Sequence, residues 1–110
     1  MNTIFAYCTC ESSEQAKLIA REVISKRLAA CANILPKMTS LYWWENAIQQ
    51  SEEVVLILKT REDLFDQLNK LVLSLHSYKT PCLISLQIVS GNPSYLEWIL
   101  TETSSHSKSS

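Results

Sequence analysis

The chain has 110 residues, of which 46% are apolar, and a formal net charge of −1 at pH 7. This length fits a single domain with one modest hydrophobic core. A charge so close to zero argues against a dominant electrostatic attachment to nucleic acid or to an anionic membrane. The only glycine, Gly91, excludes glycine-rich phosphate-binding loops. No apolar run is long enough to span a bilayer and no secretory signal is evident, so we expect a cytoplasmic protein.

The first quarter of the chain predicts a strand followed by a helix. Residues 3–9 are apolar and rich in strand-forming types, and Ser12 with Gln15 three positions later suggests a capping box at a helix start. Apolar residues then recur at helical spacing. They are Ala16, Ile19, Ala20, Val23, Ile24 and Leu28.

The next segment predicts one long hairpin. Residues 31–44 read as a strand in which Pro36 marks a bulge or an edge position, because proline removes a ladder donor. Glu45 and Asn46 read as the turn, since asparagine tolerates positive φ. Residues 48–60 return as a strand with an unbroken apolar run.

The last part predicts helix, strand and helix. Thr60 and Asp63 are candidate caps for a second amphipathic helix that extends to Leu75. Residues 82–89 read as a fourth strand. The sequence Gly91-Asn92-Pro93 then predicts a turn, an N-cap and a proline at the first position of a short final helix.

The order of these elements predicts an α+β fold of the ferredoxin-like type. The pattern βαββαβ with a C-terminal helix implies two helices on one face of an antiparallel sheet with strand order 4-1-3-2. We expect a single domain over residues 1–102. The serine-rich residues 103–110 contain no apolar side chain, so a disordered tail is predicted there.

The apolar pattern also predicts self-association. The first and third strands are apolar on both faces, although two helices can cover only one. Tyr42, Trp43 and Trp44 follow Leu41 directly before the hairpin turn, and a strand sends alternate side chains to opposite faces. All of these side chains therefore cannot fold back onto the core of their own subunit. We expect another copy of the chain to cover them.

Four stretches of the sequence resemble the CutA family of divalent-cation tolerance proteins. They are residues 27–36 (RLAACANILP), 40–45 (SLYWWE), 78–81 (YKTP) and 91–98 (GNPSYLEW), in order and in register along residues 3–100. The resemblance implies a ferredoxin-like subunit in a tight homotrimer similar to the trimeric PII signalling proteins. It also implies a link to copper and other divalent metals. Proposed copper ligands of the family fall on Cys8 and His76, while a second histidine position is occupied by Leu75.

The predicted topology indicates where metal ligands would gather. Cys8 and Cys10 end the first strand, Cys82 begins the fourth, and His76 lies in the loop before it. The same reasoning places Cys31 at that end of the sheet. Thiolate and imidazole groups suit Cu(I) and Zn(II), so we hypothesise a soft-metal site of Cys8 or Cys10 with Cys82 and His76. The alternative is that the thiols only pack, as small apolar groups, and that His76 sits near a helix C-terminus.

Other proteins that share this element order fit less well. An acylphosphatase needs a cationic loop where residues 10–14 are acidic, and an RNA-recognition domain needs stacking aromatics where residues 54–58 are aliphatic. Copper chaperones of this fold carry CxxC in the loop rather than CxC at the strand end. No catalytic constellation stands out, so we expect no enzyme. Two functions remain: a homotrimeric copper- or divalent-metal-binding tolerance protein, or a PII-like signalling or scaffolding trimer for a non-metal ligand or a partner protein.

Overall fold

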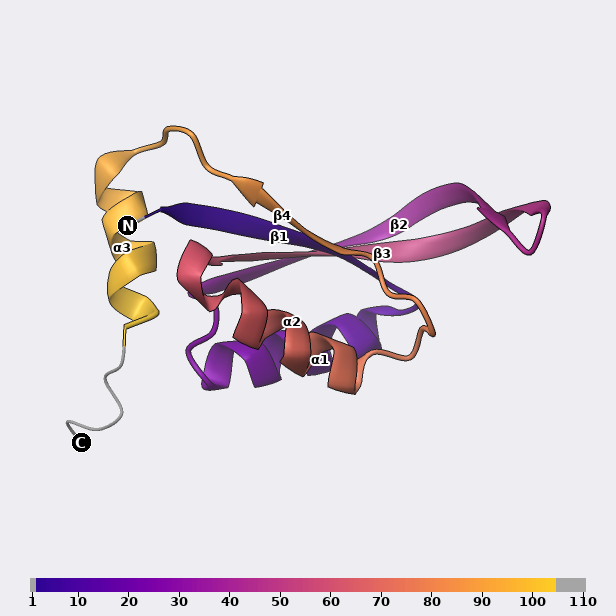
Figure 1. The fold of residues 1–110 in the computed structure, drawn as a ribbon, viewed down its shortest axis with the longest axis horizontal. Helices are drawn as coiled ribbons and strands as arrows, with labels where there is room; N and C mark the ends of the chain where they lie inside the picture. Colours follow the sequence, from indigo (N-terminus) through magenta and orange to yellow (C-terminus); the bar gives the residue numbers. More distant parts are fainter. Residues whose placement is uncertain (1, 105–110) are drawn as a thin grey trace.

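The computed structural model describes residues 2–104. The elements along the chain are β1 (Thr3–Cys10), α1 (Ser13–Ser25), β2 (Cys31–Trp44), β3 (Ala47–Arg61), a 3-10 turn (Glu62–Leu64), α2 (Phe65–Leu75), β4 (Leu83–Gln87) and α3 (Pro93–Glu102). The antiparallel strands lie in the order β2-β3-β1-β4, with α1 and α2 side by side on one face (Figure 1). The predicted α+β ferredoxin-like fold with a C-terminal helix is confirmed.

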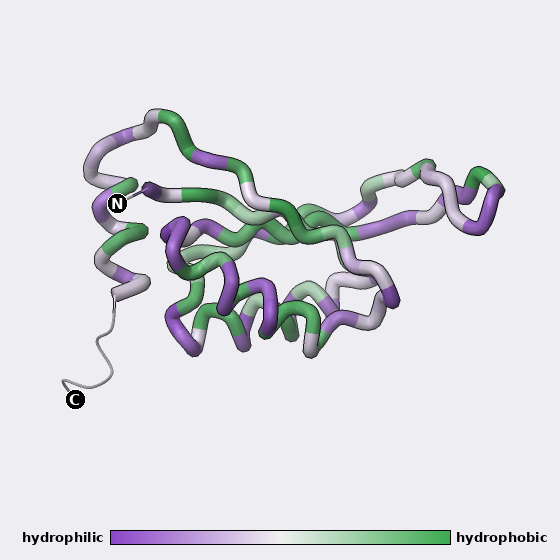
Figure 2. Tube along the Cα trace, viewed as in Figure 1, coloured by the Kyte–Doolittle hydropathy of each residue, from purple (hydrophilic) through white to green (hydrophobic). Residues whose placement is uncertain are grey.

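The core lies between the sheet and the two long helices. Alternate side chains of β1, from Ile4 to Cys10, point toward the helices and are fully buried. Leu56 and Leu58 of β3 pair with Cys8 and Ala6 and are equally buried. Figure 2 shows apolar residues gathered along the central strands, and apolar residues alternating with polar ones along the two helices. Burial of these side chains from water is the main source of stability.

The opposite face of the sheet is covered neither by α1 nor by α2. Phe5 and Tyr7 point to it from β1 and pair with Leu86 and Ile84 of β4. Ile84 is 53% exposed and Leu86 is 41% exposed. The prediction that the central strands are apolar on both faces is thus confirmed, and within one subunit the second apolar face meets solvent. We call the two surfaces the helix face and the open face.

The β2–β3 hairpin extends beyond the helices and gives the subunit its length (Figure 1). Its two-residue turn has positive φ at Glu45 (51°) and Asn46 (63°), the combination of a type I′ turn, so the predicted turn is confirmed. Near this turn Leu41 and Trp43 are the most exposed, at 66% and 71%, and Tyr42 and Trp44 are exposed as well. None of the four is packed into the core of its own subunit.

In the first half of the chain the structure confirms the predicted bulge and the predicted helix cap, and it confirms the capping box only in part. The register shifts between Leu35 and Met38, which is the bulge expected around Pro36. Ser12 caps α1, its Oγ accepting a hydrogen bond from the backbone N–H of Gln15 at 3.1 Å. The side chain of Gln15 does not return to Ser12, as a capping box requires, but bonds to the end of α2.

The predicted start of α2 is wrong. Thr60 is still part of β3, paired with Ile4 and fully buried, so it does not cap a helix. The 3-10 turn Glu62–Leu64 follows, and no side chain caps either the turn or α2. The reason is that β3 continues as far as its pairing with β1 does, which shifts the helix start to Phe65. The cap of α3 is as predicted, because Asn92 accepts a hydrogen bond from the N–H of Ser94.

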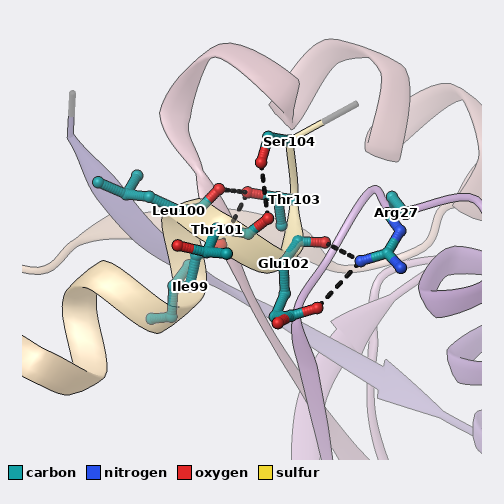
Figure 3. Close-up of polar contacts among 7 residues, drawn as sticks. All are labelled: Arg27, Ile99, Leu100, Thr101, Glu102, Thr103 and Ser104. Carbon is teal, nitrogen blue, oxygen red and sulfur yellow. Dashed lines mark hydrogen bonds and ion pairs between the residues drawn. The ribbon is translucent and has the colours of Figure 1, made fainter. Parts of the chain in front are cut away.

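The end of the described chain is attached to the rest of the domain by Arg27. This residue ends α1 with φ at 58°, and the N–H groups of Arg27 and Leu28 bond back to the helix as in a Schellman motif. Its guanidinium Nη1 donates to the carbonyl oxygen of Glu102 (2.9 Å) and to its carboxylate (3.0 Å), as Figure 3 shows. Thr103 is buried and donates to the carbonyl of Ile99.

The structure describes only the first two residues of the predicted tail, Thr103 and Ser104. Thr103 and Ser104 close the last turn of α3, and residues 105–110, where disorder was expected, lie outside the described residues. Within residues 2–104, no helix combines the length and the apolar character that crossing a membrane requires.

Candidate metal centre

Three of the four predicted metal-binding residues meet at one end of the helix face. Cys8 and Cys10 are two positions apart at the end of β1, so both side chains point to the same side, and both are fully buried. His76 follows directly after α2, where the chain turns to an extended conformation. The Sγ atoms of the two cysteines and a ring nitrogen of His76 all lie within 4.8 Å of one another.

The start of α1 holds His76 in this position. The side-chain N–H of Gln15 donates to the carbonyl of Leu75 at 3.3 Å, and its Oε1 accepts from the backbone N–H of Ser77 at 3.1 Å. The Ser77 hydroxyl also bonds to Gln15 and to Glu11. These contacts fix both sides of His76 next to the end of β1.

Both ring nitrogens of His76 have backbone partners. Nε2 lies 2.8 Å from the carbonyl oxygen of Thr9, and Nδ1 lies 3.1 Å from the N–H of Tyr78. A carbonyl only accepts and an N–H only donates, so these contacts assign the donor role to Nε2 and the acceptor role to Nδ1. The ring thus bridges the end of β1 and the loop before β4.

The two buried thiols influence each other. A hydrogen bond with Cys10, reinforced by burial, raises the pKa of Cys8 above its usual range. The same hydrogen bond, received from Cys8, lowers the pKa of Cys10. The Cys8 thiol also lies 3.8 Å from the carbonyl of Thr9. Cys10 is therefore the first of the pair to become a thiolate, the form in which cysteine binds metal.

This donor set fits a soft metal ion. Thiolate sulfur and imidazole nitrogen are preferred ligands of Cu(I) and Zn(II), whereas Mg²⁺ and Ca²⁺ require oxygen ligands. Within residues 2–104 no other set of three or more histidine, cysteine or acidic side chains converges in this way. The groups that converge where a metal could sit are the thiols of Cys8 and Cys10 and the imidazole of His76.

The structure places the other two cysteines elsewhere. Leu83 pairs with Cys8 and packs into the core, so the preceding Cys82 belongs to the open face, where desolvation raises its pKa. Cys31 pairs with Lys59, which in turn pairs with Phe5, near the start of β1. The expectation that Cys31 shares the end of the other thiols is wrong, because β1 and β3 are antiparallel and the end of β3 lies beside the start of β1.

The sequence interpretation missed a hollow of about 520 Å³ on the open face. Its walls include Tyr7, Trp44, Glu53, Tyr78, Lys79 and Cys82. Glu53 is only 9% exposed, and its carboxylate accepts a 2.7 Å hydrogen bond from the Tyr78 hydroxyl. Desolvation and this bond raise the pKa of Tyr78.

The signal for this hollow was present in the sequence. In β3, Glu53 shares a face with Val55 and Ile57, so a carboxylate interrupts an otherwise apolar face. Of the predicted interface residues, Tyr42 and Trp44 line the hollow, whereas Trp43 does not.

Comparison with known proteins gives a consistent result. Residues 4–102 match the family model of the CutA1 divalent ion tolerance protein. The chain is 45% identical over 101 residues to "Protein CutA 1, chloroplastic" of Oryza sativa, covering 92% of this chain and 57% of that protein. It is 41% identical over 95 residues to the "Divalent-cation tolerance protein CutA" of Archaeoglobus fulgidus, covering 86% of this chain and 92% of that protein.

The solved structures agree in fold as well as in sequence. The crystal structure of CutA1 from Oryza sativa matches with a TM-score of 0.91 at 43% identity, covering 94% of this chain and 95% of that one. The protein from Thermus thermophilus matches with a TM-score of 0.90 at 36% identity, covering 93% and 99%. The chain spans less than two thirds of the length of its rice and mouse relatives. Because the family model matches nearly the whole chain, from residue 4 to residue 102, the chain belongs to the CutA1 divalent ion tolerance family.

Proposed function

We propose that this protein binds a soft metal ion, with copper as the first candidate, at the Cys8–Cys10–His76 group, and that this binding serves the tolerance of metal ions. The observation that supports the proposal is the convergence of two thiol sulfurs and an imidazole nitrogen within 4.8 Å of one another. The family name supports the link to divalent cations. We further propose that the protein acts by binding rather than by catalysis, in a reducing cytoplasm where the thiols stay available.

A titration with Cu(I) under reducing conditions, against a chromophoric chelator, tests this proposal. We expect one equivalent per chain to resist the chelator. Cys8→Ser and Cys10→Ser should each abolish this binding, because each removes one sulfur from the group. Cys31→Ser and Cys82→Ser are the matched controls and should bind as the wild type does. Equal copper affinity in the wild type and in Cys8→Ser would rule the site out.

We also propose that the functional unit is a homotrimer. The open face exposes Ile84 and Leu86, and the hairpin exposes Leu41 and Trp43, so the isolated subunit leaves two apolar regions in water. Copies of the chain that cover one another would bury both. Sedimentation equilibrium in dilute buffer should give three times the subunit mass, whereas a stable monomer would contradict this proposal.

The hollow on the open face supports a second candidate function, the PII-like binding of a non-metal small ligand. A nearly buried carboxylate at Glu53 beside aromatic walls can hold a small molecule that offers a hydrogen-bond donor. A thermal-shift screen of polar metabolites, with Glu53→Gln as the control, tests it. A compound that stabilises the wild type but not Glu53→Gln would favour this function; a screen without such a compound would count against it.

A further inference from the structure

We infer that copper is held as Cu(I) by the Cys8 and Cys10 thiolates alone, and that His76 is a positioning residue that closes the site rather than a ligand. This inference rests on the proposed metal binding and specifies its ion and its ligands. Three features carry it: the hydrogen bonds of His76, the small number of ligands and the complete burial of both thiols.

His76 has no free lone pair to offer. Nδ1 uses its lone pair to accept the N–H of Tyr78, and Nε2 carries the proton that it donates to Thr9. Coordination through Nδ1 would leave the Tyr78 N–H without its acceptor. Coordination through Nε2 would move the proton to Nδ1, where it would face that same N–H, donor against donor. Either way, ligation by His76 breaks the contact between the ring and the Tyr78 backbone.

The loop around His76 opposes such a change. The hydroxyl of Tyr78 is fixed by its 2.7 Å bond to Glu53. The neighbouring Ser77 is bonded to Gln15 through both its N–H and its hydroxyl. The His76 and Tyr78 rings also pack together, with their centroids 4.8 Å apart. A metal that recruited His76 would have to disrupt this network.

Without His76, two sulfur ligands remain. Structural Zn(II) takes four protein ligands in nearly every case, and residues 2–104 offer no further cysteine, histidine or carboxylate in this group. Cu(I) is a softer ion that is stable with two thiolates. The site should therefore select Cu(I) over Zn(II).

The binding step is a simple exchange. Cys8 and Cys10 each form one S–Cu bond and each release one proton to solvent, and copper enters and stays as Cu(I). The product carries one net negative charge.

The burial of the two thiols gives His76 its role. Both sulfurs belong to fully buried residues, so an ion can reach them only when the surrounding structure opens. The bonds of His76 to Thr9 and Tyr78 join the end of β1 to the loop before β4, next to the two thiols. His76 thus controls how fast copper exchanges, without setting how many ligands hold it.

X-ray absorption spectroscopy of the copper-loaded wild-type protein tests the ligand set. We expect sulfur scatterers only and an edge typical of Cu(I). Outer-shell scattering from an imidazole would overturn this inference and leave the proposed function intact. A wild-type protein that retains no stoichiometric copper would overturn both, so the two failures are distinguishable.

Two variants of His76 test its positioning role with a kinetic measurement. His76→Ala should still bind one Cu(I) and should release it to a chelator faster, on the order of tenfold or more, because the hydrogen bonds of the ring with Thr9 and with Tyr78 are both lost. His76→Gln, whose amide can restore the bond to Thr9, should release copper at a rate nearer to the wild type. Unchanged release from His76→Ala, or loss of its bound copper, would contradict the role.

Discussion

The two faces of the sheet are built from neighbouring residues of the same strands, and yet they differ in burial and in the kind of candidate site that they carry. The helix face is closed: its apolar side chains are buried within the subunit, and Cys8 and Cys10 lie among them. The open face carries apolar residues that remain in water and a hollow around Glu53. The closed face can therefore hold a group away from solvent, whereas the open face is free for other molecules.

The alternation of side chains along a strand therefore decides which site a residue belongs to, as well as whether it is buried. Cys82 and Cys8 are close in the sheet, but they differ by one step in the alternation and so belong to opposite faces. One thiol joins the candidate metal centre and the other lines the hollow. Substitutions on the two faces should therefore have different effects on stability and on association.

Leucine substitutions on the two faces should show the largest difference in stability. Leu56→Ala on the helix face removes a fully buried side chain and should lower the free energy of unfolding by about 2–5 kcal/mol. Leu35→Ala on the open face, where the side chain is 49% exposed, should cost less than about 1.5 kcal/mol within the subunit. Urea denaturation at matched protein concentration gives both values, and equal losses would show that the faces do not differ.

Charge on the open face should act on association rather than on folding. Ile84→Glu would put a carboxylate on a face that we expect other subunits to cover, and burying an unpaired charge costs several kcal/mol. Sedimentation velocity should show the loss of the trimer, while far-UV circular dichroism stays unchanged. The matched control is Leu73→Glu on the exposed side of α2, which should leave the assembly intact. A trimer that survives Ile84→Glu would disprove our assignment of the interface.

Tyr78→Phe, in the wall of the hollow, should lower the free energy of unfolding by less than Leu56→Ala does. It leaves the nearly buried Glu53 carboxylate without its hydrogen bond, a loss of about 1–3 kcal/mol in the free energy of unfolding. Chemical denaturation at neutral pH measures this loss, and an unchanged midpoint would contradict it.

The same pair predicts how stability depends on pH. The pKa of Tyr78 is raised in the folded state by desolvation and by Glu53, so above the unfolded value of about 10 the unfolded chain binds fewer protons than the folded one. Stability should therefore fall as the pH rises above about 10, and Tyr78→Phe should fall less steeply there. Parallel slopes for the two proteins would show that Tyr78 does not contribute.

Arg27 should give the smallest effect, because it lies on neither face. Arg27→Ala loses the bonds to Glu102 and keeps a positive φ, so we expect a loss of about 1 kcal/mol. Arg27→Gly loses the same bonds but relieves the backbone, and should be more stable than Arg27→Ala by up to about 1 kcal/mol. Thermal denaturation compares the two; an alanine variant as stable as the glycine variant would mean that the positive φ carries no strain.

Sequence reasoning predicted the fold well, because strand alternation, helical spacing and turn residues are local signals that agreed with one another. Asn46 and Asn92 illustrate this, since each occupies the backbone position that its chemistry favours. The start of α2 was missed because the pairing of Thr60 with β1, a contact distant in sequence, overrode its capping propensity.

The candidate site was predicted less completely, because it depends on strand register. The sequence indicated that Cys8, Cys10 and His76 lie near one another, yet register alone decides that Cys82 faces away and that Cys31 lies near the other end. The roles of Gln15 and Tyr78 in holding His76 depend on contacts between distant segments, which no local pattern reveals.

Native mass spectrometry of the protein titrated with Cu(I) tests the trimer and the copper site together, because one spectrum reports both the number of subunits and the number of copper ions. We predict a trimer that carries one copper per chain in the wild type and in Cys31→Ser, and a trimer without copper in Cys10→Ser. A wild-type protein that stays monomeric, or that carries no more copper than Cys10→Ser, would contradict the account.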